Sequence, residues 1–550
     1  MKKPALLTLF LLITVTTFSQ HSHTAKTAPV KPAVIESGLG GVNHPVSTKN
    51  ARAQAFFNQG LAYIYAFNHA ESIKAFKRAA ELDPNLAMAY WGSALALGSN
   101  YNLTADAAQL TEAYADLQKA IALAPKASAR DRAYIDALSH RYAADPETDR
   151  QKLAAAYKTA MGELVKKYPD DLDAATLYAE SMMNLRPWQL WTRDGKPAEG
   201  TLEIVAVLEG VLKRDPTHSG ANHYYIHTVE ASPNPERALP SAKRLGGIAP
   251  NAGHLVHMPS HIYIRTGDYV EAARSNADAI VADRNYIKKY GAQGVYSMMY
   301  YNHNIHFLAS ANAMNGNYAG AIKSSRDLHD NVKPLVKTMP MLEMFTPYPA
   351  VTLVRFRKWE VILREQMPPP EMVITTAMWH FARGMAYAET GKPADAAKEL
   401  AALKEMIKAI PVDAPWGNST AQMVLKVAEN LLAGEVALAR GDISAAIKSL
   451  ASAVEAEDAV NYNEPPDWDL PTREWLGRAL LTDGRYAEAE KVYRDELVKH
   501  PKNGRALFGL IESLKKQKRD KDVRNFQTVF QRVWSKSDTP LAAGDLYFTK

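Results

Sequence analysis

Hydrophobic positions between residues 51 and 530 recur at helical spacing, in pairs of short segments separated by turns. The first folded segment, AFFNQGLAYIYAFNHAESIKAFKRAAELDP, places small and aromatic residues three or four positions apart and ends at Pro84. Apolar residues at this spacing share one face of an α-helix. The pattern therefore predicts pairs of amphipathic helices, repeated along the chain.

A period of 34 residues fits these pairs. With Ala53 as the first position of a unit, the positions of a known repeat signature are filled by Gly60, Tyr63, Phe76, Ala79 and Pro84. The same register returns from Leu470, with Gly477, Ala489, Tyr493 and Pro501. On these residues the chain resembles the tetratricopeptide-repeat family, whose unit is a helix–turn–helix. The segments HPVSTKNARAQAFFNQGLAYIYAFNH and AMAYWGSALALGSN resemble a widespread group of exported bacterial members.

The resemblance covers most of residues 51 to 530 and implies an all-α fold. Helix pairs of this family stack antiparallel into a right-handed superhelical solenoid, since no single pair buries its own apolar face. The first helix of each repeat lines a concave groove, and its positions 2, 5, 9, 12 and 13 meet ligands. We expect N-terminal repeats over 51–170, a central histidine-rich segment over 171–330, further repeats over 331–530 and a tail over 531–550.

Prolines set the register of the central repeats. Pro216 and Pro250 stand at position 32, so the next units begin at Ser219 and Gly253, and aligning GNYAGA with GDYVEA extends the register once more. On a helix, positions 2, 5, 9 and 12 span an arc of only ~80°. Seven of the 16 histidines and one glutamate thus fall on groove positions of three consecutive first helices: His223, His227 and Glu230; His254, His257 and His261; His303 and His306.

This histidine face predicts a site for a divalent transition metal. Imidazole is the commonest side-chain ligand of zinc, copper and iron, and one carboxylate is a usual companion. Eight candidate groups exceed one tetrahedral shell, so some orient the ligands or there are two ions. Two alternatives stay open: a metal-free, histidine-lined ligand groove, and simple packing of histidines.

Pro259 interrupts the middle of the three helices. It either kinks the helix, or the helix begins late, near Met258, and leaves His254 and His257 on the entering loop. One repeat earlier, Glu180 falls at position 9 and is a candidate ligand or general base; a solvated groove carboxylate is the alternative. Two inserted loops, NLRPWQLWTRDGKPAEG and NYNEPPDWDLPTREW, carry tryptophans that either cover the groove or close off helix ends.

The N-terminus changes the picture of where the protein acts. Lys2 and Lys3 precede an apolar run from Ala5 to Phe18, which predicts a cleavable signal peptide over 1–20 and an exported protein, periplasmic or secreted. A flexible leader is expected over 21–50. No other long apolar run exists, so we expect no membrane span after cleavage. The chain has no cysteine, which excludes disulfides and thiolate metal sites.

The net charge bears on which classes of partner the protein could bind. The value of +6 is spread over 550 residues without a basic block, which argues against nucleic acid. The first functional hypothesis is an exported metalloprotein with a small molecule or peptide in its groove. As an enzyme it would fit zinc-activated hydrolysis or a copper or iron redox centre. The second hypothesis is a periplasmic scaffold that binds peptides or partner proteins without metal, on fold analogy.

Overall fold

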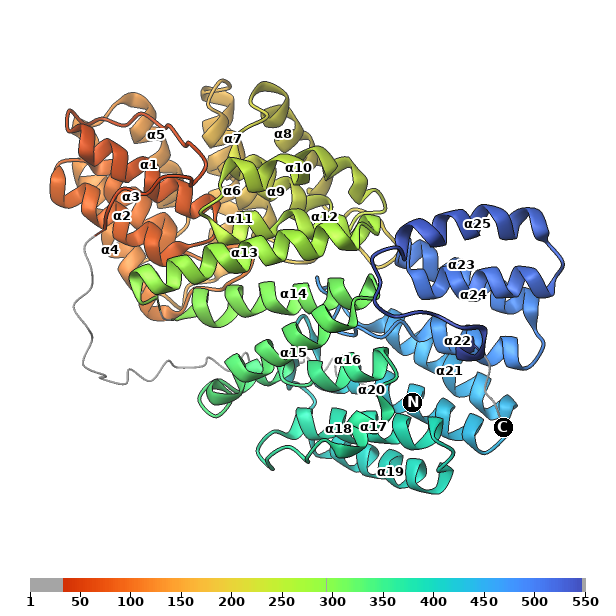
Figure 1. The fold of residues 1–550 in the computed structure, drawn as a ribbon. Coiled ribbons are helices and arrows are strands. Elements are labelled where there is room, and N and C mark those ends of the chain that lie inside the picture. The colour runs from red at the N-terminus through yellow and green to blue at the C-terminus, as the bar shows by residue number, and fades with distance from the viewer. Residues whose placement is uncertain (1–32, 293, 547–550) are drawn as a thin grey trace, which may run out of the picture.

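The computed structural model describes residues 33–292 and 294–546 (Figure 1). Their helices pack as antiparallel pairs in sequence order, which confirms the all-α repeat architecture. The predicted signal peptide, residues 21–32 of the leader and the end of the tail, 547–550, lie outside the described residues. Within the described part, no helix is both long and apolar enough to cross a membrane.

The N-terminal repeats begin where the side chain of Asn50 accepts from the backbone N–H groups of Arg52 and Ala53 and so caps the first helix. Gly60 lets the second helix approach, because a Cβ there would lie 2.7 Å from the ring of Phe76. The elements are α1 (Ala51–Tyr65), α2 (His69–Leu82), α3 (Ala87–Leu97), α4 (Ala107–Leu123), the 3-10 helix η1 (Ala124–Lys126), α5 (Ala129–Ser139) and α6 (Arg150–Lys167).

The central segment holds the three histidine-bearing first helices and their partners. Its last pair is irregular, since one partner helix extends to Tyr290 and a π-helix leads directly into the next first helix. The elements are α7 (Leu172–Met183), α8 (Thr201–Arg214), α9 (Ser219–Val229), η2 (Pro235–Ala238), α10 (Leu239–Ile248), α11 (Gly253–His257), α12 (Pro259–Thr266), α13 (Tyr269–Tyr290), η3 (Tyr296–Tyr300), α14 (Tyr301–Met314) and α15 (Tyr318–Val332).

The C-terminal segment begins with short helices and continues as regular pairs. A two-residue antiparallel ladder, β1 (Pro415–Trp416) with β2 (Ser419–Thr420), precedes α20. The helices are η4 (Lys333–Leu335), η5 (Pro340–Phe345), α16 (Tyr348–Arg355), α17 (Trp359–Arg364), α18 (Val373–Glu389), α19 (Pro393–Ala409), α20 (Ala421–Ala439), α21 (Ile443–Ala459), α22 (Thr472–Thr482), α23 (Tyr486–Lys499), α24 (Gly504–Lys516), α25 (Asp520–Val533) and η6 (Ala543–Leu546).

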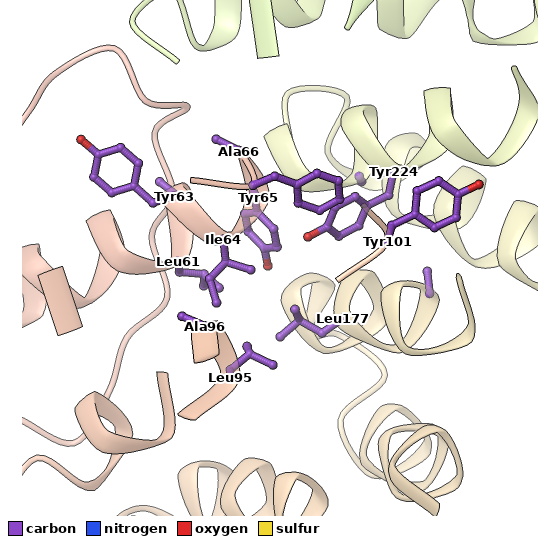
Figure 2. Close-up of a cluster of buried hydrophobic side chains, with 14 of the residues drawn as sticks. Leu61, Tyr63, Ile64, Tyr65, Ala66, Leu95, Ala96, Tyr101, Leu177 and Tyr224 are labelled. Carbon is purple, nitrogen blue, oxygen red and sulfur yellow. The ribbon is translucent and has the colours of Figure 1, made fainter. Parts of the chain in front are cut away.

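The buried side chains form one core in the N-terminal and central repeats and another in the C-terminal repeats. Figure 2 shows part of the first core, at the end of α1, where Tyr65 lies beside Tyr224 of α9. This contact joins the first repeat to the first histidine-bearing helix. The backbone carbonyl of Tyr65 is thereby brought to the histidines.

The second part of the leader, 33–50, lies against the helices rather than free of them. His44 is 3% exposed, and its Nδ1 donates to Oδ2 of Asp173 on α7 at 2.8 Å. The amide of Gln59 accepts from the backbone N–H of Glu36 and donates to the carbonyl of Val34. Composition alone predicts a flexible leader over 21–50; in its described part, 33–50, buried polar contacts of this kind hold the chain against the helices.

The C-terminal repeats turn back onto the central ones (Figure 1). Lys502 forms an ion pair with Asp268 at 2.6 Å, next to a hydrogen bond from the Tyr269 hydroxyl to the carbonyl of Pro501. The loop between α21 and α22, residues 460–471, reaches α14, where Ser310 donates to Asp469 at 2.9 Å. The loop therefore lies beside the helix that carries His303 and His306.

Candidate metal centre

Three helical segments bring the histidine face together. His223 and His227 lie one turn apart on α9, and Glu230 is the residue that ends this helix. The middle repeat contributes His254 and His257 from α11 and His261 from α12, and α14 contributes His303. Apart from the partly buried His303, all of these groups are at most 2% exposed.

The first group of ligand atoms combines two repeats. One nitrogen each of His223, His227 and His254 lie within 4.8 Å of one another. The Nε2 atoms of His223 and His254 are 3.1 Å apart. We call these three residues the first trio.

The second group combines the middle repeat with the next one. Nitrogens of His257, His261 and His303 lie within 4.8 Å of one another and form the second trio. Nε2 of His257 is 2.8 Å from Nε2 of His261 and 3.2 Å from Nε2 of His303. Two nitrogen ligands on one tetrahedral ion, each about 2.0–2.1 Å from it, lie roughly 3.3 Å apart. The donor set therefore fits one ion with small side-chain adjustments.

Glu230 links the two trios. Its carboxylate, 0% exposed, accepts from Nδ1 of His227 at 2.8 Å and makes a short contact with Nδ1 of His261. Burial works to raise the pKa of Glu230, but His261 and His227 outweigh it and lower this pKa to about 2. The carboxylate is thus ionised at neutral pH and orients one histidine of each trio.

The hydrogen-bond partners fix the tautomer of four imidazoles. Nδ1 of His223 faces the carbonyl oxygen of Tyr65 at 2.7 Å, and Nδ1 of His257 faces Oδ1 of Asn276 at 2.7 Å. Carbonyl, amide and carboxylate oxygens accept but do not donate, so Nδ1 carries the hydrogen in these two residues and in the two histidines bound to Glu230. In the neutral ring, Nε2 then keeps its lone pair and points inward.

The inward lone pairs lack a positive partner. A hydrogen on Nε2 of His254 can bond to His223, so the first trio contains one satisfied contact. His257 and His261 oppose two Nε2 lone pairs at 2.8 Å, which is repulsive unless a cation, either a metal ion or a proton, lies between them. Nε2 of His227 is buried without a partner. Burial first, then neighbouring histidines, lowers the pKa of His257 well below its usual value, which disfavours added protons.

Known proteins identify the repeat. The tetratricopeptide-repeat family model matches residues 53–86 and residues 474–522. The chain carries tetratricopeptide repeats. No curated protein sequence matches it.

The solved structures that match the chain share little sequence with it. The APC/C hetero-tetramer Cut9-Hcn1 is 14% identical over 92% of this chain and 78% of that one, with a TM-score of 0.29. The human IFIT1 dimer with m7Gppp-AAAA is 13% identical over 89% of this chain and 91% of that one, with a TM-score of 0.35. At these scores neither likeness bears on function.

Pro259 lies at the junction of the two short helices that carry the histidines of the middle repeat. Met258 keeps helical backbone angles, φ −51° and ψ −35°, so α11 and α12 meet with a single residue between them. Each alternative from the sequence holds in part: a new helix does begin at Pro259, but His254 and His257 lie on the short helix before it rather than on a loop. Pro259 occupies the first position of α12, where its missing N–H is tolerated.

Two sequence candidates do not join the trios. His306 points toward the C-terminal loop, where its Nε2 is 3.9 Å from Oδ2 of Asp469 and its ring contacts Tyr348. Glu180 accepts from the amide of Asn184 and interacts with Arg141, away from the ligand groups. Its pKa is raised by burial, against the opposing effect of that arginine. The repeat register predicts a groove position for Glu180, but α7 lies one repeat before the first histidine-bearing helix.

Sequence reasoning missed three contributors to the site. Asn276 lies on α13, on the face that buries Ala272 and Ala279, and a polar residue on such a face was a usable signal. Phe67, with φ 53°, packs its ring against His223 at a centroid distance of 4.5 Å. The Tyr65 carbonyl, which accepts from His223, could not be found from residue type. A backbone acceptor of this kind depends only on where a helix ends.

Proposed function

We propose that the protein is an exported metalloprotein that holds transition-metal ions in the two histidine trios, linked by Glu230. The observation that carries the proposal is the set of four anchored Nδ1 atoms, which leave the Nε2 lone pairs of two histidines in each trio free to bind a metal ion. Metal-binding histidines in proteins are oriented in this way by acceptors on the other ring nitrogen. Export is supported by the N-terminal sequence.

The donor set suits zinc, copper or iron. Imidazole nitrogens with one nearby carboxylate match borderline metals, while the absence of cysteine from the sequence removes thiolate coordination. An ion bound there would supply Lewis acidity or a redox centre. The protein's own contribution is to hold the imidazoles neutral and oriented, through Glu230, Asn276 and the Tyr65 carbonyl.

Metal analysis of tag-free protein tests the proposal. We expect about one to two equivalents of zinc, copper or iron per chain. The double variant His257→Ala, His261→Ala should lose at least half of it. The matched control is His380→Ala, His500→Ala, which removes two histidines that pair with Glu399 and Glu496 outside the site. Parent protein with metal content near zero after growth and reloading with each metal would falsify the proposal.

A metal-free scaffold for peptides or partner proteins is the second candidate function, and metal content near zero in the preceding test would favour it. It rests on the repeat architecture, which serves peptide binding in many proteins. A scaffold predicts that captured peptides bind equally well in the presence of a chelator. It also predicts that the His257→Ala, His261→Ala variant still binds those peptides. The metalloprotein proposal makes neither of these two predictions about peptide binding.

A further inference from the structure

A cavity of about 270 Å³ opens beside the trios. Imidazoles from all three repeats form one wall of it: His227, His254, His261, His303 and His306. Nε2 of His227 and Nε2 of His306 are buried without a hydrogen-bond partner. This wall therefore offers polar nitrogen atoms, or a metal ion held by them, to whatever enters the cavity.

The remaining walls are mainly apolar and come from segments far apart in the sequence. The chief contributors are Trp188, Met299, Met344, Phe345, Tyr348 and Trp416. Methionine and aromatic side chains give large contact areas and adapt to flat, apolar ligands. Asp467 is the one charged side chain among the described lining residues apart from the histidines, and no lysine or arginine is among them.

The mouth of the cavity is also apolar. Leu103 and Met341 both line it and are 38% and 46% exposed, unusually high for large hydrophobic residues. They lie more than 200 residues apart in sequence, one after α3 and the other on η5. Exposed apolar groups that border an internal cavity favour entry of an apolar molecule over an ion.

We propose that this cavity binds a small, mainly apolar molecule, the size of a substituted aromatic ring, with its single polar group toward the histidine wall. A cavity of about 150 Å³ accepts benzene, so this one has room for a ring with substituents. An anionic group at the end of the ligand opposite the histidine wall would be buried without a cationic partner, which is costly. The inference rests on the proposed function, because the metal ions supply the partner for the polar end.

Two matched phenols test the ligand class. The probes are 4-methylphenol and 4-hydroxybenzenesulfonate, which share the phenol and differ in charge at the opposite end. Titration calorimetry or ligand-observed NMR on the metal-loaded protein should give at least about tenfold weaker binding of the sulfonate, since its charge must be desolvated. Equal affinities for the two probes, or binding of neither, overturn the inference.

Three variants assign the binding to this cavity. Met344→Trp fills it and should weaken 4-methylphenol at least about tenfold, as occupied volume is no longer available to the ligand. Met367→Trp, at a position 64% exposed and outside the lining, is the matched control and should bind like the parent. Met341→Arg adds a cation at the half-exposed mouth, which needs no repacking, and should strengthen sulfonate binding severalfold.

The outcomes separate this inference from the metal proposal. Metal content is measured on the same samples. Protein that holds metal but does not bind 4-methylphenol contradicts the cavity inference alone. Protein without metal that binds 4-methylphenol, and loses it in Met344→Trp but not in Met367→Trp, contradicts the metal centre and supports the apolar cavity. Unchanged 4-methylphenol binding in a folded Met344→Trp variant, together with no gain of sulfonate in Met341→Arg, overturns the assignment.

Discussion

The central and C-terminal repeats both bury polar side chains where neighbouring helices meet, but they balance charge differently. In the C-terminal repeats, Arg478 of α22 contacts Glu389 of α18 at 3.2 Å and Glu435 of α20 at 3.4 Å. All three are at most 8% exposed as side chains. In the central repeats, Glu230 and all members of the two trios except the partly buried His303 are at most 2% exposed, and the group contains no lysine or arginine.

The difference distinguishes a structural cluster from a ligand site. The arginine supplies its own cation to the buried carboxylates, so the C-terminal cluster is complete within the chain. The central cluster turns the Nε2 lone pairs of His257 and His261 toward one another and includes no lysine or arginine. Under the proposed function, a bound metal ion supplies the missing positive charge. Burial of polar groups alone is therefore no evidence of function in a repeat protein; the missing counter-charge is.

Among the variants that test this comparison, Arg478→Met should have the largest effect on stability. This change leaves the carboxylate of Glu389 buried without the arginine that contacts it, which should cost about 3–5 kcal/mol in the free energy of unfolding. Urea denaturation measures it, and metal content should not change. Arg485→Met, in an exposed pair with Glu488, is the control and should leave the unfolding curve in place. A small loss in Arg478→Met would mean that the C-terminal cluster is not balanced by this arginine.

Asn276→Ala sharpens the comparison from the central side. It removes the acceptor that holds Nδ1 of His257, so metal affinity should fall about 10–100-fold. Competition with a chromogenic chelator measures the affinity. Asn222→Ala is the matched control, since Asn222 is equally buried and bonds only to the carbonyls of Pro216 and His218. Equal losses of affinity in both variants would point to general destabilisation instead of ligand orientation.

Asn276 also illustrates how far the sequence could lead. The period of 34 located the repeats and the histidine-bearing helices, because helix faces follow directly from residue spacing. Spacing along one helix also predicted that His223 and His227 share a face. It could not predict that Nδ1 of His223 would meet the backbone carbonyl of Tyr65, 158 residues away, since this depends on how distant helices pack.

His306 and Glu180 show the limit most clearly. The repeat register predicts groove positions for both, yet the side chain of His306 lies near Asp469, which the C-terminal loop brings back from 163 residues away. Repeat register predicts which face a residue lies on. It does not predict which distant segment covers that face, and the irregular loop at 460–471 has no period from which to infer it.

Acid should lower the free energy of unfolding through His306, by a smaller amount than the changes described above. Burial lowers the pKa of His306 to about 3, whereas the unfolded chain has an ordinary histidine pKa near 6.5. Between pH 6 and 4 the unfolded state therefore binds one more proton at this position, and stability falls as pH falls. His306→Asn should make the slope shallower by about 1.4 kcal/mol per pH unit in metal-free protein.

Urea denaturation at several pH values measures this slope. Asp469 contributes in the opposite direction, because burial raises its pKa to about 7 and the folded state holds a proton there that the unfolded chain has released above its ordinary pKa. This contribution is common to the parent and to His306→Asn, so the difference between their slopes reports His306. His380→Asn is the comparison variant, as its imidazole pairs with Glu399 on the C-terminal repeats. An unchanged slope in His306→Asn would show that its imidazole is protonated in the folded protein.

The smallest effect is expected for Glu435→Gln, which asks where the C-terminal cluster keeps its negative charge. Burial raises the pKa of Glu435, and Arg478 only partly opposes this. For Glu389 burial acts in the same direction, but Arg478 and Arg357 outweigh it and lower the pKa. Arg478 thus pairs chiefly with Glu389, while Glu435 holds a proton near neutral pH and resembles an amide.

Glu435→Gln should therefore change the unfolding free energy by less than about 1 kcal/mol. Glu389→Gln leaves Arg478 without its charged partner and should change it by several times more. If the two variants unfold alike, the cluster shares its charge evenly, and the contrast with the central histidines rests on the arginine alone.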